Sequence, residues 1–164
     1  MNFDINFRDL FDKVLCFSQP NFQPSSAHKF VMDLALHTFV FDRMALINIL
    51  REQQSLGAHT DVVEFREKAT TTYRWTHPGA RPMGNDAPAS VQCPQCGHLK
   101  TVSPKSTGQI ASTLKCSKCP WSEIYGLPEG FKWCQGETPT NGLERGAWAA
   151  KVERNVSKDH MQVS

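Results

Sequence analysis

The amino-acid sequence predicts an α+β protein in which a small mixed α/β domain at the N-terminus precedes an antiparallel, cysteine-rich module. Apolar residues recur at helical and strand spacings in the first half of the chain, and two closely spaced cysteine pairs lie in the second half. We expect a mixed domain over residues 1–77, a Pro/Gly-rich linker over 78–90, the cysteine-rich module over 91–134 and a polar, partly disordered tail over 135–164.

The first expected helix lies near the N-terminus. Apolar residues from Phe7 to Leu15 fall at i, i+3, i+4, i+7 and i+8, which places them on one face of a helix that ends before Pro20. The dense apolar run over residues 30–36 fits a buried strand or a helix, and its periodicity does not separate the two.

A further helix and two strands complete the predicted mixed domain. The helix begins after Asp42, carries apolar residues over 46–50 and ends at Gly57, where a left-handed residue is favoured. Residues 62–65 and 70–75 are rich in β-branched and aromatic side chains, which predicts two strands. In the polar tail, the apolar residues around Leu143–Val152 are compatible with a short helix.

Composition narrows the class of protein. The chain has 164 residues and a formal net charge of +2, which alone does not indicate a nucleic-acid partner. The first residues lack the basic and apolar regions of a signal peptide, and no apolar run approaches the ~20 residues of a membrane span. Because the cysteines do not form a disulfide pattern, we expect an intracellular protein, nuclear or cytoplasmic, without a membrane partner.

Four of the six cysteines form the most specific pattern in the sequence. Two residues separate Cys93 from Cys96, nineteen residues follow, and Cys116 and Cys119 repeat the first spacing. Each pair fits a tight turn that aims two sulfurs at one point, and two such turns supply the four thiolates of a tetrahedral zinc site. Soft thiolates also suit iron, so iron stays open as an alternative metal.

The segment Cys93-Pro94-Gln95-Cys96-Gly97 resembles the first knuckle of zinc-ribbon and rubredoxin-type proteins, in which proline and glycine shape the turn. The resemblance is limited to residues 91–134 and implies an antiparallel sheet with strands over 109–115 and 121–125. Pro120 departs from the family, because glycine is common at that position of the second knuckle. A closed site of four cysteines leaves no coordination position for water, so we expect Zn²⁺ to be structural and no residue to be catalytic.

One histidine and the two remaining cysteines are further candidates for metal ligands or core residues. His98 follows Cys96 closely, but we expect it to be exposed or to neighbour the site rather than to replace a cysteine. Cys134 and Cys16 each lie apart from the pairs, and we expect Cys134 to be a buried or accidental thiol and Cys16 to belong to the core.

Lysines and aromatic residues are interleaved around the cysteine pairs. Residues 92–132 hold five lysines and two glutamates, so positive charge collects on this module. Lysines neutralise phosphates and exposed aromatics stack on unpaired bases, which favours a nucleic-acid or protein partner. Alternatively, the aromatic residues pack the module against the N-terminal domain. The candidate partner-binding residues are Lys100, Lys115, Lys118, Trp121 and Tyr125.

The leading prediction is therefore a non-catalytic binding module with structural zinc. As an alternative, the module is an accessory on a hydrolase-type or remnant enzyme domain, or the chain is a fragment of a larger protein. An enzyme would have to draw on scattered groups such as Cys16, Asp33 and His59, since the sequence holds no Gly-rich phosphate loop and no nucleophile elbow.

Overall fold

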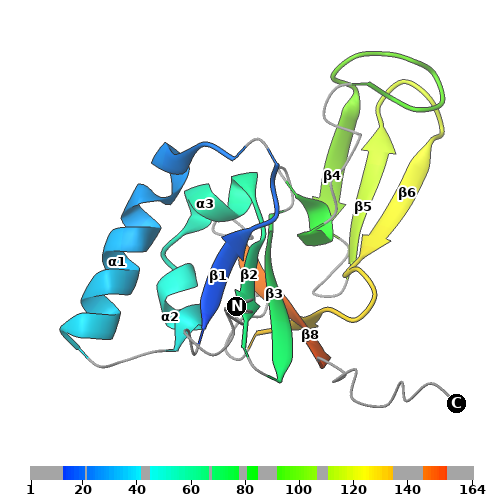
Figure 1. Cartoon of the computed structure of the whole chain (residues 1–164). Coiled ribbons are helices and arrows are strands. Elements are labelled where there is room, and N and C mark those ends of the chain that lie inside the picture. The colour runs from blue at the N-terminus through cyan, green and yellow to red at the C-terminus, as the bar shows by residue number, and fades with distance from the viewer. Residues whose placement is uncertain are drawn as a thin grey trace, which may run out of the picture.

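The computed structural model describes residues 13–20, 22–41, 45–66, 68–77, 81–84, 92–106, 111–134 and 146–154. Within these ranges the chain forms helices and two antiparallel sheets, as the predicted α+β class requires. Figure 1 shows the helices on one side of a five-stranded sheet and a separate three-stranded sheet on the other side.

The five-stranded sheet draws its strands from both ends of the chain. Its order is β1-β2-β3-β8-β7, and all neighbours are antiparallel. The strands predicted over 62–65 and 70–75 are confirmed as β2 and β3. The bounds are Val14–Phe17 for β1, Val62–Phe65 for β2, Ala69–Thr76 for β3, Lys132–Trp133 for β7 and Ala147–Arg154 for β8.

Strand β8 corrects the prediction for the polar tail. The short helix expected around Leu143–Val152 is wrong, because Ala147–Arg154 pairs with β3 along its whole length. Trp148 lies opposite Trp75 in this pairing and is only 1% exposed. Burial of the two indoles between sheet and helices outweighs the helix preference of the alanines beside Trp148, because tertiary packing overrides local propensity.

Strand β1 replaces the end of the first predicted helix. Val14 and Leu15 belong to a strand, so the helix prediction is wrong for them, while residues 1–12 lie outside the described ranges. Burial alternates along β1: Leu15 and Phe17 pack against the core, whereas Val14 and Cys16 are exposed. An alternating pattern is the signature of a strand with one covered face, and it also moves Cys16 out of the predicted core.

Four short helical elements cover the face of the sheet that Phe17 shares. The run over 30–36 is helical, within α1, and Gly57 lies inside α3 rather than at a helix end. Gly57 is required there for close packing, because a Cβ atom would lie 2.4 Å from Trp75 Cβ. The elements are η2 Pro24–Ala27, α1 His28–Phe39, α2 Leu46–Leu50 and α3 Gln54–His59.

The hydrophobic core lies between these helices and the sheet. Its centre consists of fully buried side chains from each layer. The helices contribute Phe30, Leu50 and Leu56, and the sheet contributes Val62 and Trp148. The expected cap Asp42 lies outside the described residues, so the start of α2 is described from Ala45 onward.

The three-stranded sheet consists of β4 Val102–Ser106, β5 Ala111–Cys116 and β6 Ser122–Gly126, in that order. The predicted strands over 109–115 and 121–125 are thus present, with residues 109 and 110 outside the described ranges and the other bounds shifted by one residue. In sequence, this sheet lies between β3 and β7 of the larger sheet. The cysteine-rich module is therefore inserted between two strands of the other sheet.

Part of the predicted linker is packed between the two sheets. His77 and Arg81 exchange two backbone hydrogen bonds of 2.9 Å, and η3, Pro82–Gly84, contacts β3, β5 and β6. Arg81 donates to the Gly57 carbonyl (3.1 Å) and pairs with Asp61 (3.0 Å). These contacts hold residues 81–84 against the five-stranded sheet. Within the described residues, no helix is long and apolar enough to cross a membrane.

Candidate metal centre

The four paired cysteines meet at one end of the three-stranded sheet. Cys116 ends β5 and Cys119 lies in the turn before β6, while Cys93 and Cys96 lie in the loop that precedes β4. In Figure 1 these loops occupy the end of the sheet away from the five-stranded sheet. The four Sγ atoms all lie within 4.8 Å of one another, so residues far apart in sequence form one cluster.

Backbone hydrogen bonds within each turn position the sulfurs. In the first turn, the Gly97 N–H donates to the Cys93 carbonyl (3.0 Å) and the Cys93 N–H donates to the His98 carbonyl (2.9 Å). Gly97 has a φ of +71°, a conformation that glycine adopts without steric cost. In the second turn, the Cys116 N–H donates to the Trp121 carbonyl (3.0 Å). Both turns are therefore closed by backbone hydrogen bonds.

Two of the six sulfur–sulfur distances match those of a tetrahedral metal site, and all six are within 4.8 Å. The Sγ atoms of Cys93 and Cys119 lie 3.7 Å apart, and those of Cys96 and Cys116 lie 3.8 Å apart. Four sulfurs at about 2.3 Å from a zinc ion stand about 3.8 Å apart at the corners of a tetrahedron. The residues present thus fit a metal ion of this size.

Hydrogen-bond donors surround Cys116 in particular. The Thr101 hydroxyl lies 3.3 Å from Cys116 Sγ, and the Lys118 backbone N–H donates to the same sulfur (3.3 Å). These contacts, that of Thr101 foremost, lower the pKa of the Cys116 thiol to about 6. The sequence pattern did not indicate Thr101, because its position next to the sulfur depends on the pairing of β4 with β5.

At Cys96 and Cys119 the pKa of the thiol is raised instead of lowered. At Cys119 the Trp121 backbone amide lowers the pKa, but desolvation and the neighbouring thiols of Cys96 and Cys93 outweigh it and raise the value to about 12. Thiols packed this closely resist forming several thiolates at once, because like charges repel. A bound cation removes that penalty.

The four cysteines of the cluster differ in their exposure to solvent. Cys93 is only 1% exposed, Cys116 and Cys119 are half-buried, and Cys96 is exposed.

The remaining candidate ligands, Cys134 and His98, are not part of the four-cysteine cluster. Cys134 follows β7, where its N–H donates to the Trp148 carbonyl (3.1 Å), and His98 is exposed. Among the described residues, the group that could hold a metal ion contains the four paired cysteines and no histidine.

The five candidate partner-binding residues do not share one face of the sheet. In the pairing of β5 with β6, Lys115 lies opposite Ser122, whereas Tyr125 lies opposite Ser112. Because side chains alternate along a strand, Lys115 and Tyr125 point to opposite faces. Lys100 and Lys118 are exposed beside the cysteine turns, and Trp121 is half-buried.

The groups considered for an enzyme lie on different elements. Cys16 points to the side of the sheet opposite the helices that carry His28, His37 and His59. The Asp33 carboxylate is occupied by Lys29 Nζ and Gln53 Nε2, each at 2.6 Å. The hydrogen bond from the Lys29 ammonium is the main reason that the pKa of Asp33 is lowered.

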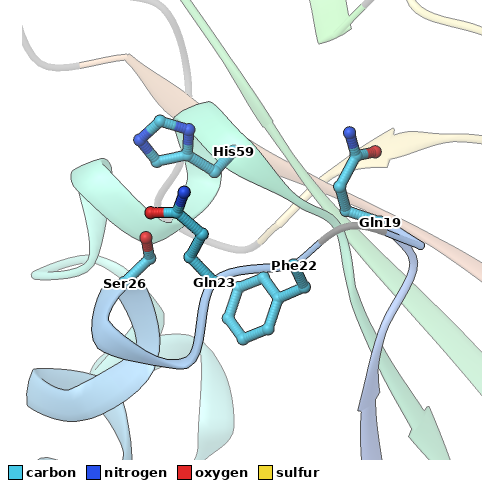
Figure 2. Close-up of a pocket in the computed structure, with 5 residues that line it drawn as sticks. All are labelled: Gln19, Phe22, Gln23, Ser26 and His59. Carbon is cyan, nitrogen blue, oxygen red and sulfur yellow. The ribbon is translucent and has the colours of Figure 1, made fainter.

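A cavity of about 210 Å³ lies between the segment around η2 and the end of α3. Figure 2 shows the described lining: His59 comes from α3, and Gln19, Phe22, Gln23 and Ser26 come from the segment between β1 and α1. This described lining includes no carboxylate and no thiol that would pair with the imidazole in acid–base or nucleophilic catalysis.

No protein-family model, curated protein or solved structure matches this chain. Its function is therefore inferred from the geometry of the cysteine cluster and the surfaces around it.

Proposed function

We propose that the chain binds one zinc ion through Cys93, Cys96, Cys116 and Cys119, and that the ion holds residues 92–126 together as a zinc ribbon. The sulfur separations of 3.7 and 3.8 Å carry this proposal, because they equal the edges of a tetrathiolate zinc site and the other separations stay within 4.8 Å. The zinc ribbon serves as a non-catalytic binding module.

The role proposed for zinc is structural. Four protein sulfurs fill a tetrahedral coordination sphere, so no position is left at which water or a substrate would be activated. The fully buried side chains of the three-stranded sheet include Leu114, while Lys115, Glu123 and Ile124 are exposed. A sheet with so little apolar interior depends on a metal for stability, and structural zinc sites supply roughly 10–16 kcal/mol at neutral pH.

Metal analysis of the purified chain tests this proposal. We expect one zinc per chain, and we expect Cys96→Ser to lower the zinc content because it removes one ligand. Cys16→Ser is the matched control, since Cys16 is an exposed thiol on β1 outside the cluster. Iron in place of zinc would identify a rubredoxin-like centre. A full-length chain without any metal, folded over residues 92–126, would contradict the proposal.

We further propose that the ribbon end that carries the cysteines contacts nucleic acid. Three observations support this: Lys100, Lys115 and Lys118 are exposed, Lys100 and Lys118 lie beside the cysteine turns, and Lys115 precedes Cys116. A protruding end with several lysines neutralises phosphates, and each phosphate contact releases counterions. Because Tyr125 lies on the other face from Lys115, we assign it no role in this contact.

Fluorescence anisotropy with labelled single- and double-stranded oligonucleotides tests this contact. At about 50 mM salt we expect binding whose affinity falls as salt rises, and each lysine replaced by alanine reduces the salt slope by about one. Lys29 and Lys151, which lie outside the ribbon and form ion pairs, provide the matched alanine controls. If neither oligonucleotide binds under these conditions, the partner of the ribbon is a protein.

A further inference from the structure

Helix α1 exposes an apolar surface on the side away from the core. Its inner face contributes Phe30 and Leu34 to the core cluster. Its outer face and the turn that follows carry large apolar side chains whose exposed fractions run from 46% at Leu36 to 85% at Phe39. These exposed residues are Val31, Met32, Leu36, Phe39, Val40 and Phe41. We refer to this set as the α1 patch.

The spacing of the α1 patch resembles the seam of a helix pair. Met32, Ala35, Leu36 and Phe39 stand at i, i+3, i+4 and i+7, which aligns them along one side of the helix. The charged residues of α1, Lys29 and Asp33, lie beside this line and form an ion pair with each other (2.6 Å). A surface helix that is apolar on both faces is normally buried on both faces.

The chemistry of the α1 patch argues against a lipid surface. Helices that lie in a membrane interface carry lysines and arginines along the flanks of their apolar face. Lys29 is the one lysine or arginine of α1, and its ammonium is already paired with Asp33. A partner with its own uncharged, apolar helix face is a better match.

We propose that the α1 patch is the interface of a homodimer, in which α1 packs antiparallel against α1 of a second copy. An antiparallel pair centred near Ala35 places Phe39 of each copy against Met32 of the other. The small, half-buried Ala35 at the centre allows the two helices to approach closely, and the large side chains fill the space on either side. Such a twofold interface uses the same patch on both copies, as in most dimers.

The size of the patch is consistent with a stable dimer. A largely exposed aromatic side chain buries ~150 Å² or more, and an aliphatic one somewhat less, so six such residues offer on the order of 600 Å² per copy. Standard interfaces bury about 800 Å² per partner. The apolar centre of the proposed interface therefore leaves room for a polar rim of ordinary extent.

Sedimentation or light scattering of the full chain across a range of concentrations tests the proposal. We expect a particle of twice the 18.4 kDa chain mass at micromolar concentration. Leu36→Glu is expected to weaken dimerisation at least 100-fold and to leave the circular dichroism spectrum unchanged, because Leu36 is exposed in the single chain. The matched control is Ile124→Glu, which introduces the same charge at a site that is 71% exposed. Ile124 lies on β6 of the three-stranded sheet, outside the α1 patch.

A charge pair tests the antiparallel arrangement itself. Met32→Lys and Phe39→Glu are each expected to weaken the dimer, whereas the double variant restores it, because every lysine then faces a glutamate of the other copy. A parallel arrangement would set like charges against each other, and the double variant would stay monomeric. A double variant that stays monomeric would overturn the antiparallel arrangement. A monomeric parent chain, or a dimer that survives Leu36→Glu but not Ile124→Glu, would overturn the proposed interface.

Discussion

The carboxylate of Asp61 stands between two arginines at the junction of the helices, the large sheet and residues 81–84. It is 3% exposed. Arg74 donates to its Oδ2 from Nε (2.9 Å) and from a terminal nitrogen (2.6 Å), and Arg81 reaches its Oδ1 at 3.0 Å. A buried charge of this kind is tolerated because both its partners are charged and close.

We predict that Asp61→Asn lowers the free energy of unfolding by about 3 kcal/mol, because the substitution leaves two partly buried guanidinium groups without a counter-charge. Urea titration of the two proteins measures the difference. Asp33→Asn on α1, whose side chain is 30% exposed and forms an ion pair with the exposed Lys29, is the control and should cost less than about 1 kcal/mol. Equal losses for the two variants would mean that the network around Asp61 is no more than a surface ion pair.

Protonation of the four thiols sets the pH dependence of metal binding. Zinc bound as proposed above takes four thiolates, whereas in the metal-free cluster the raised pKa values of Cys96 and Cys119 keep these two thiols protonated at pH 8, and Cys116, with a pKa near 6, is already a thiolate. Metal binding therefore releases protons, and lowering the pH weakens it because protons compete for the sulfurs. Adding Zn²⁺ to metal-free chain in a weak buffer should release more than one proton per ion at pH 8. Cys119→Ser should release fewer, and a pH-independent affinity would contradict this account.

At the scale of single elements, α3 packs unusually close to the sheet. A Cβ atom at Gly57 would lie 2.4 Å from Trp75 Cβ and 2.9 Å from Trp148 Cζ2. We predict that Gly57→Ala destabilises the chain by roughly 1–3 kcal/mol, although alanine favours a helix by about 1 kcal/mol. Ser55→Ala, at an exposed position of the same helix, should change stability by less than about 0.5 kcal/mol. Thermal unfolding distinguishes them, and a stabilising Gly57→Ala would show that α3 shifts freely.

The elements that sequence could predict are those defined by their own side chains. Strands β2 and β3 are rich in β-branched residues, so local pattern was sufficient for both, whereas β5 and β6 were implied by the resemblance of the cysteine turns to a zinc ribbon. The run in α1 stayed ambiguous because both of its faces are apolar, which removes the helical period. Strands β1 and β8 were missed because each is defined by its pairing partner, β2 or β3, far away in the chain.

The same contrast holds for the site and the whole molecule. The four cysteines were predictable because two short turns fix their spacing, and the two Sγ pairs meet at 3.7 and 3.8 Å. The insertion of the three-stranded sheet between β3 and β7 could not be predicted, because no local signal shows that Trp148 lies opposite Trp75. This long-range pairing of β8 with β3 is what makes the cysteine-rich module an insertion rather than a separate C-terminal module.

If the cysteine cluster binds zinc as proposed above, the insertion implies that the two sheets differ in how they depend on the metal. The five-stranded sheet and its helices share a core that includes Phe30, Leu50 and Trp148, and none of these side chains belongs to residues 92–126. Extending or shortening the connection between β3 and β7 changes the free-energy cost of loop closure only slowly, by about 0.6 kcal/mol for each doubling of loop length.

We therefore predict that replacing residues 92–126 by a short Gly/Ser linker gives a folded chain that binds no zinc. Retained near-ultraviolet circular dichroism from Trp75 and Trp148, with cooperative unfolding insensitive to chelators, would confirm this. In the intact chain, a chelator should then expose residues 92–126 to protease and leave β8 protected. A linker variant that lacks cooperative unfolding would instead show that the three-stranded sheet and η3 are part of the core that holds β8 in place.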